Sequence, residues 1–163
     1  MLDSLTSPIL SFLAVFPPPI ASFLLGAAPI SEVRGAAIYA FQQGNHALIL
    51  YGIAGNIAAA LALILLWDIF HIEKIGRRIL GSRIERKIED FKKNHELGET
   101  IALAVFIAIP LPGTGAYTGV LIGKILNISD KKLVVASIAG VLGSALIMYL
   151  ALSGTVSFLS IFK

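Results

Sequence analysis

The residues with the clearest potential for chemistry are Glu32 and Arg34, in the segment GAAPISEVRGAAI. They stand two positions apart in a run of otherwise small and apolar residues, shortly after Pro29. Charged side chains are costly in apolar surroundings, so inside a membrane they usually face an interior cavity. A carboxylate balanced between burial and a nearby guanidinium could take up and release a proton. The arginine could instead bind an anionic group of a substrate.

A structural role is the alternative for Glu32 and Arg34. Residues two apart on a regular helix point in different directions, so they form a good pair only in an unwound stretch, where alternate residues share a side. Such a pair could stabilise its own segment, or reach another segment or a second subunit. The sequence leaves the structural ion pair and the proton-linked site both open.

Prolines interrupt two of the apolar segments. Pro29, Pro110 and Pro112 each lack an amide hydrogen and disfavour a helical residue before them. Non-helical backbone at membrane depth is tolerated only against protein or beside a water-filled cavity. We therefore expect two half-helices around each interruption, and the three prolines are candidate site residues.

The residues after each interruption suit the start of a half-helix that faces a ligand. Ser31 and Thr114 are the predicted N-caps. Helix N-termini present free N–H groups and partial positive charge, which suit anions. Gly113 and Gly115 would let a ligand approach the backbone closely.

A few further polar residues are candidates for the same site. Tyr117 and Thr118 follow the second interruption and could line a pocket. Asn56 lies in a long apolar run and could hydrogen-bond across a helix interface or line a cavity. The histidines lie far apart without metal-ligand spacing, and no phosphate-loop, GxSxG or nucleophile–base pattern is visible. We expect no metal, no cofactor, no catalytic residue and no enzyme activity.

The composition is typical of a membrane protein. The chain has 163 residues, of which 56% are hydrophobic and 14% are charged, and its mean hydropathy is +0.86. A single domain of this size cannot bury so much apolar surface in its own core. Membrane lipids are therefore the expected partners. The absence of cysteine excludes disulfides and thiolate sites.

The long apolar segments predict the membrane spans. Residues 46–70 form an unbroken apolar run that is long enough to cross a hydrocarbon core of about 30 Å as a helix. Residues 133–160 supply a second span, and the interrupted segments 20–43 and 100–126 each precede one of the two. This order of features repeats along the chain and indicates an internal duplication.

A charged segment separates the two halves. Eight of the 13 Lys and Arg residues lie between Lys74 and Lys93. Isoleucines recur there at roughly helical spacing, which predicts an amphipathic helix over residues 71–99. It would lie on the membrane surface, near lipid headgroups rather than nucleic acid. A solvated connecting helix packed on its own protein is the alternative.

The charges also orient the chain, because loops rich in Lys and Arg remain cytoplasmic. Residues 71–99 are then inside. If residues 100–126 crossed the membrane fully, Lys124, Lys131 and Lys132 would lie outside, whereas a re-entrant hairpin keeps them inside. By the repeat, the first hairpin enters from outside, as in inverted-repeat transporters. Fully spanning segments that contain prolines are the alternative.

We therefore predict an all-α integral membrane protein with a single membrane domain over residues 1–163. It contains two inverted repeats, 1–70 and 100–163, each a re-entrant helical hairpin followed by a transmembrane helix. The amphipathic helix connects them. We expect a multi-pass protein of the plasma membrane with both termini outside.

Two segments carry a resemblance to a known family. APISEVRGAAIYAF resembles the proline–x–x–Glu–x–Arg–Gly–Ala element of the small multidrug export protein family, and AIPLPGTGAYTGVLIGKIL resembles its second signature. That family is distantly similar to the DedA/VTT superfamily. The resemblance implies two opposed re-entrant hairpins and, for some DedA members, proton-coupled movement of polyprenyl-phosphate or phospholipid. Glu32 matches the acidic position of the first hairpin, whereas the arginines of DedA proteins around the second hairpin have no counterpart here.

The expected function is secondary membrane transport. Glu32 would be the proton-linked site, and Arg34 with the backbone at Gly113–Gly115 would hold a small amphiphilic or anionic solute. The alternatives are a DedA-type flippase or scramblase for polyprenyl-phosphate or phospholipid, and a non-transporting scaffold or assembly factor. We also expect a homodimer. Small residues at four-residue spacing suit close helix contacts within the chain or between the two subunits: Ala54, Ala58 and Ala62, and Ala136, Gly140 and Ser144.

Overall fold

The structure is a computed structural model that describes residues 15–67, 96–111 and 113–161. Within these ranges it has six helices and no strand, which confirms the predicted all-α fold. The helices are α2 (Pro18–Ala27), α3 (Glu32–Gln42), α4 (Leu48–Leu66), α7 (Glu96–Ala108), α8 (Ala116–Ile125) and α9 (Asp130–Ile161). The predicted connecting helix lies outside the described residues except for its last residues, which begin α7.

Two of the helices are long and apolar enough to cross a membrane. They are α4, with 19 residues, and the Asp130–Gly154 part of α9, with 25 residues. Both fall on the predicted spans, because an unbroken apolar run of about 20 residues forms one helix of membrane length. In each of these helices, 39% of the most apolar 18-residue stretch is buried within the protein. The remaining apolar surface is available to lipid.

In the first half, α2 and α3 form a hairpin around residues 28–31. Pro18 occupies the first turn of α2, where its missing N–H costs nothing. The helix ends at Ala27, and the next residue, Ala28, has an extended backbone (φ −79°, ψ 133°) because the following Pro29 disfavours the helical conformation. Glu32 then starts α3 with a positive φ of 50°. We call residues 28–31 the first break.

In the second half, α7 and α8 form the corresponding hairpin around residues 109–115, the second break. α7 ends at Ala108, two residues before Pro110. Gly113 has φ +84° and Gly115 has φ +154° with ψ −176°, a combination open essentially to glycine. The glycines therefore permit the turn that the proline begins. Pro112 lies outside the described residues.

Two ion pairs bring the ends of the second hairpin together. The Lys124 ammonium, in the last turn of α8, lies 2.8 Å from a carboxylate oxygen of Asp130 at the start of α9. Lys132 of α9 lies 3.6 Å from the Glu99 carboxylate near the start of α7. The beginning of α7, the end of α8 and the start of α9 are therefore at one end of the molecule, and the α7–α8 pair doubles back on itself.

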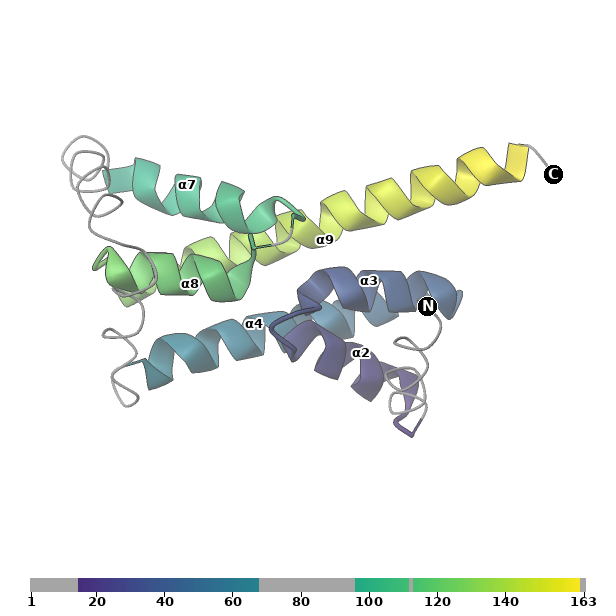
Figure 1. Ribbon diagram of the computed structural model, residues 1–163, viewed down its shortest axis with the longest axis horizontal. Helices are drawn as coiled ribbons and strands as arrows, with labels where there is room; N and C mark the ends of the chain where they lie inside the picture. Colours follow the sequence, from purple (N-terminus) through teal and green to yellow (C-terminus); the bar gives the residue numbers. More distant parts are fainter. Residues whose placement is uncertain (1–14, 68–95, 112, 162–163) are drawn as a thin grey trace.

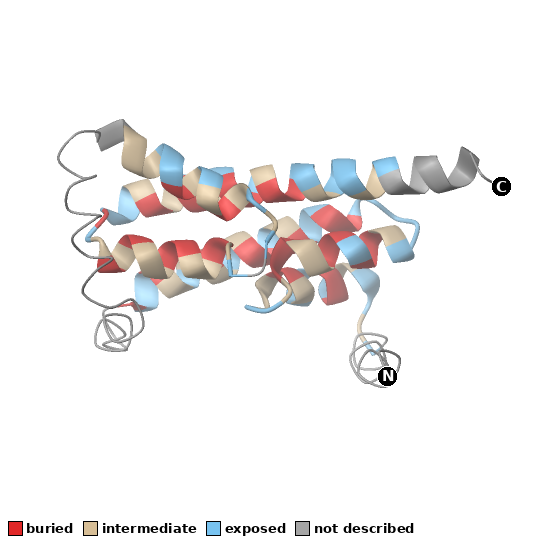
Figure 2. Ribbon diagram, turned by 45° about the horizontal axis from the view of Figure 1, so that its top comes forward, coloured by how far each residue is buried: buried red, intermediate tan, exposed pale blue. Residues whose placement is uncertain are grey.

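The two hairpins point toward each other from opposite ends (Figure 1). Their breaks meet near the middle of the long axis, while α4 and α9 pack together and run in opposite directions. Buried residues gather where the hairpins face the long helices, and exposed residues cover the outside and the part of α9 that approaches Gly154 (Figure 2). The arrangement brings the two breaks together at the middle of the molecule, where Ile30 and Leu111 are exposed.

Glycines allow close helix contacts, but only one of the two predicted small-residue stripes lies inside the chain. An added Cβ at Gly140 would overlap Ile107 of α7, so the stripe on α9 packs within the protein. The stripe on α4 is on the exposed surface. Instead, α4 packs on α2 and α3 through two glycines. A Cβ at Gly52 would overlap Ala36 of α3, and a Cβ at Gly55 would overlap the Phe23 carbonyl of α2.

Candidate functional site

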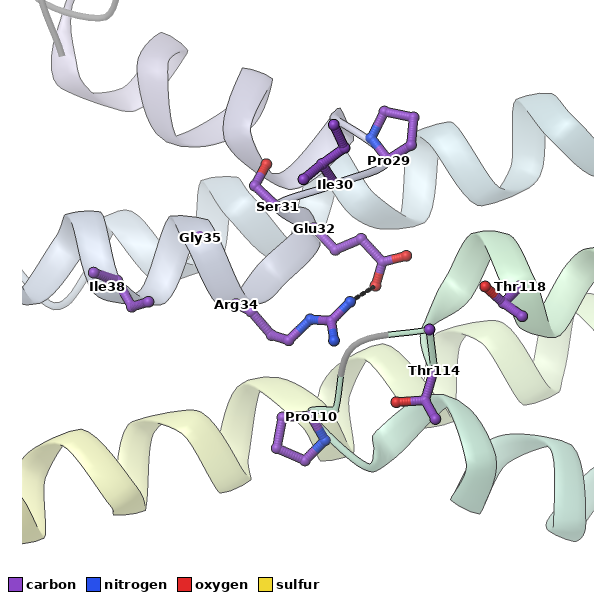
Figure 3. A pocket seen from close by; sticks show the side chains of 11 residues that line it. Pro29, Ile30, Ser31, Glu32, Arg34, Gly35, Ile38, Pro110, Thr114 and Thr118 are labelled. Carbon is purple, nitrogen blue, oxygen red and sulfur yellow. Dashed lines mark hydrogen bonds and ion pairs between the residues drawn. The ribbon is translucent and has the colours of Figure 1, made fainter. Parts of the chain in front are cut away.

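A pocket of about 530 Å³ lies between the two breaks (Figure 3). The first break and α3 form one wall, and the second break with the start of α8 forms the other. The structure thus brings together residues that are about 80 positions apart in the chain. Eight of the predicted site residues line the pocket: Pro29, Ser31, Glu32, Arg34, Pro110, Gly113, Thr114 and Thr118.

Glu32 and Arg34 form an ion pair at the centre of this site. Arg34 Nη2 lies 3.1 Å from Glu32 Oε2, and the side chains are 17% and 6% exposed. Both residues belong to the first turn of α3, where positions two apart would normally diverge. The positive φ of Glu32 unwinds the start of the helix and lets the two side chains meet.

The Glu32 carboxylate also lies at the N-terminus of α8. Its Oε1 accepts a hydrogen bond from the Tyr117 backbone N–H at 3.4 Å. An added Cβ at Gly115 would overlap the carboxylate, so the glycine is needed for this approach. A negative charge is favourable at this end of a helix, because the first N–H groups are free and the helix dipole is positive there. A carboxylate from the first half therefore stabilises the first turn of a helix in the second.

Two further hydrogen bonds connect the halves. Arg34 Nη1 donates to the Leu111 carbonyl in the second break, and the Tyr117 hydroxyl donates to the Ala27 carbonyl at the end of α2. Tyr117 does not line the pocket, in contrast to its expected position. Since the guanidinium is already held by a carboxylate and a carbonyl oxygen, the charges of Glu32 and Arg34 balance within the site.

Ser31 stands at the N-cap position of α3 as predicted but makes no capping hydrogen bond, whereas the prediction for Thr114 is wrong because Gly115 is the N-cap of α8. Ser31 precedes α3, but its hydroxyl donates to the Leu25 carbonyl at 2.6 Å and makes no cap hydrogen bond. Thr114 Oγ1 lies 2.5 Å from the Ile109 carbonyl and 2.8 Å from the Leu111 carbonyl, and α8 begins only after the next glycine. Both hydroxyls satisfy carbonyl groups at the end of the preceding helix or in the break, where intrahelical partners are missing.

Residues 32–147 match the protein family described as "Putative small multi-drug export protein". The chain belongs to this family. The match begins at Glu32, covers both members of the ion pair and the whole second break, and ends within α9. The family and the two long apolar helices together indicate a membrane protein. No curated protein and no solved structure matches the chain, and the relation to the DedA/VTT superfamily stays a prediction.

The region shared with the export family also contains Asn56, which is 1% exposed. It does not line the pocket, and neither atom of its carboxamide has a hydrogen-bond partner among the described residues. Its expected hydrogen bond across a helix interface is therefore not observed. Among the residues that the structure describes, no group of three or more His, Cys, Asp or Glu side chains could hold a metal ion.

The sequence analysis did not predict three residues of the pocket wall. Ile30, Gly35 and Ile38 line the pocket beside the predicted residues, and so does the anticipated Thr118. The signal was available, because positions 31, 35 and 38 are spaced like one face of a helix. Once Ser31 and Arg34 were candidates, this spacing would have extended the site along α3.

Proposed function

We propose that this protein is a secondary transporter whose substrate binds between the two breaks, with transport coupled to protonation of Glu32. The observation that carries this proposal is a pocket at which two oppositely directed, interrupted helix pairs meet, with a carboxylate–guanidinium pair in its wall. Transporters built from inverted repeats place their sites at such interruptions, near the middle of the membrane. Non-helical backbone at that depth requires protein or a cavity beside it.

The charge distribution supports two inverted repeats with re-entrant hairpins in the plasma membrane. Lys124 and Lys132 lie at the end of the molecule from which α7 starts, directly after the basic segment 71–95. Basic loops remain cytoplasmic, so the second hairpin enters from the cytoplasm and the first from outside. Both termini then lie outside.

The pocket is suited to a small amphiphile. Its volume of about 530 Å³ is within the range of about 300–1,000 Å³ that is usual for small-molecule sites. Ile30, Ile38 and the prolines supply apolar surface, while Arg34, Ser31 and Thr118 supply polar groups. A pocket of this size and polarity favours transport over a scaffold, for which a dry, ion-paired centre would be expected.

The ion pair suggests how substrate and proton are linked. While Glu32 is ionised, its carboxylate forms an ion pair with the guanidinium of Arg34 and competes with any other anion for it. Protonation of Glu32 removes this competitor and frees Arg34 for an anionic group of the substrate. Loss of the proton restores the ion pair and expels that group. An anionic amphiphile would therefore move together with a proton.

Flux through proteoliposomes with an imposed pH gradient tests this proposal. Glu32→Gln and Arg34→Ala are expected to abolish pH-driven accumulation of an anionic amphiphile. Glu99→Gln and Lys132→Ala are the matched controls, because they break an ion pair of 3.6 Å far from the breaks. Movement of phospholipid alone would indicate a lipid translocase. Movement of lipophilic cations that Arg34→Ala spares would contradict the anion-coupled scheme.

Access of water to the breaks is a separate test, which uses the absence of cysteine from the chain. Ser31→Cys and Thr114→Cys line the pocket and should react with a membrane-impermeant thiol reagent. Leu133→Cys is the buried control, since Leu133 is 0% exposed. Labelling of either break from both faces of the membrane would support alternating access, and two unreactive breaks would favour the scaffold.

A further inference from the structure

Asn56 is a buried side chain with two polar atoms that the proposed mechanism leaves unexplained; the hydroxyls of Ser137 and Ser153 are the other buried side-chain groups without a hydrogen-bond partner among the described residues. Asn56 is 1% exposed, and both Oδ1 and Nδ2 are without a hydrogen-bond partner among the described residues. Buried polar groups are nearly always hydrogen-bonded, to protein or to ordered water, because leaving them unpaired is costly. An unsatisfied donor and acceptor on one side chain therefore indicate a ligand.

The packing of α4 places Asn56 at the level of Glu32. An added Cβ at Gly52 would overlap Ala36, so these two positions face each other across α3 and α4. The two helices are joined by residues 43–47 and are antiparallel. One helical turn forward on α4 is therefore matched by one turn back on α3. One turn forward on α4 leads from Gly52 to Asn56, and one turn back on α3 leads from Ala36 to Glu32. Asn56 and Glu32 therefore lie at the same level.

The direction of the side chain follows from the same contacts. Gly55 packs on the backbone of α2, at Phe23 and Ala27. Successive residues of a helix are rotated by about 100°, so Asn56 points about 100° away from Gly55 and only about 40° from Gly52. It therefore faces away from α2, toward α3 and α8, both of which α4 contacts. The Glu32 carboxylate lies at the junction of those two helices.

We propose that Asn56 holds an internal water molecule that links it to the Glu32 carboxylate. A carboxamide offers both an acceptor and donors, and a water molecule can satisfy both kinds of group. A sodium ion would bind only the oxygen and leave Nδ2 unpaired. The carboxylate has further lone pairs besides those that face Arg34 and the Tyr117 amide, so it can accept the second hydrogen bond of the water.

The water gives Glu32 a partner in both protonation states, and this consequence rests on the proposed function. A water molecule donates to the ionised carboxylate and accepts from the protonated carboxyl group. Arg34 can donate only, so it cannot accept a hydrogen bond from the O–H of a protonated Glu32. Arg34 and Tyr117 are the charged and titratable side chains that face Glu32 among the described residues. Asn56 thus supports the protonated state that releases Arg34 to the substrate.

Water-to-protein magnetisation transfer tests this site by NMR on the ¹⁵N-labelled full chain in lipid bilayers. The Asn56 side-chain amide, assigned by its loss in Asn56→Leu, is expected to receive signal from water as early as the exposed Asn45 and Asn127 amides. The backbone amide of Ala60, which is 0% exposed, is the dry control one turn along α4. An Asn56 amide as slow as that of Ala60 would overturn the proposal.

The link to Glu32 is read from infrared spectra. The carboxyl or carboxylate band that Glu32→Gln removes should shift in Asn56→Leu, because the hydrogen bond from water is lost, and should keep its position in Asn56→Ser. Ile64→Leu is the apolar control on α4. An unshifted band in folded Asn56→Leu would refute the link. Neither readout requires transport: a wild-type protein with this water but no flux would contradict the proposed function and leave the hydration of Asn56 established.

Discussion

Gly115→Ala is the substitution that tests the position of the Glu32 carboxylate most directly. Gly115 has a backbone conformation that is open essentially to glycine, and an added Cβ would overlap the carboxylate. The backbone strain costs about 1–3 kcal/mol. Displacing the carboxylate from its charged partner and from the α8 amide costs about 1.5–3 kcal/mol more. We expect Gly115→Ala to lower the free energy of unfolding by about 2.5–6 kcal/mol.

Gly113→Ala is the matched control for this prediction. Gly113 has φ +84°, but an added Cβ would meet nothing within 4 Å. It should therefore cost only the strain of about 1–3 kcal/mol. Unfolding in detergent micelles can be followed through the fluorescence of Trp67, which is buried. In a Glu32→Ala background, the cost of Gly115→Ala should fall to that of the control, because the Cβ then enters vacated space.

Two results would refute this reasoning. One is an equal loss of stability from Gly115→Ala and Gly113→Ala in the otherwise unchanged protein. The other is an unchanged cost of Gly115→Ala after Glu32→Ala. Either would mean that the carboxylate does not rest against the N-terminus of α8. A coupling of about 1–3 kcal/mol between positions 32 and 115 is the expected result for side chains in direct contact.

Three other perturbations have distinct expected outcomes. Arg34→Ala should destabilise the protein by about 3–5 kcal/mol, because it leaves a buried carboxylate unpaired, and adding Glu32→Gln should recover part of this loss in the same unfolding assay. Tyr117→Phe should cost about 1 kcal/mol, the usual net worth of one hydrogen bond, and a cost near zero would mean that the bond to α2 is not made. Gly26→Ala should cost about 1–3 kcal/mol, because its Cβ would overlap the α4 backbone, whereas Gly154→Ala meets nothing and should be neutral or slightly stabilising in thermal unfolding.

The helices and their interruptions were predictable because their signals are local. A proline acts on its own residue and on the one before it, so Pro29 and Pro110 mark the ends of α2 and α7 to within two residues. The unbroken apolar runs likewise predicted α4 and α9. Such signals need no knowledge of which segments meet in space.

The contacts across the breaks were not predictable in this way. Ser31 and Thr114 were assigned as N-caps because their types suit the position, but the carbonyl groups freed at each break compete for the same hydroxyls and bind them instead. The carboxylate that stabilises α8 comes from Glu32, 85 residues before its partner Tyr117. No spacing in a single sequence identifies such a pair. The positive φ that lets Glu32 meet Arg34 is likewise set by the packed break.

The polar contacts across the breaks are reciprocal, and this has a consequence for the proposed transport. The first half gives a carboxylate to the free amides of α8 and a guanidinium to the carbonyl of Leu111, while the second half gives the Tyr117 hydroxyl to the last carbonyl of α2. Each half satisfies groups that the other leaves unpaired, and unpaired groups at membrane depth are costly. The breaks therefore cannot separate unless something replaces these partners. Water entering the pocket or the polar groups of a substrate can do so, and binding of either would lower the cost of opening. Under the proposed function, a substrate without hydrogen-bonding groups would fill the pocket and leave the breaks closed, so we expect transport of amphiphiles over purely apolar solutes.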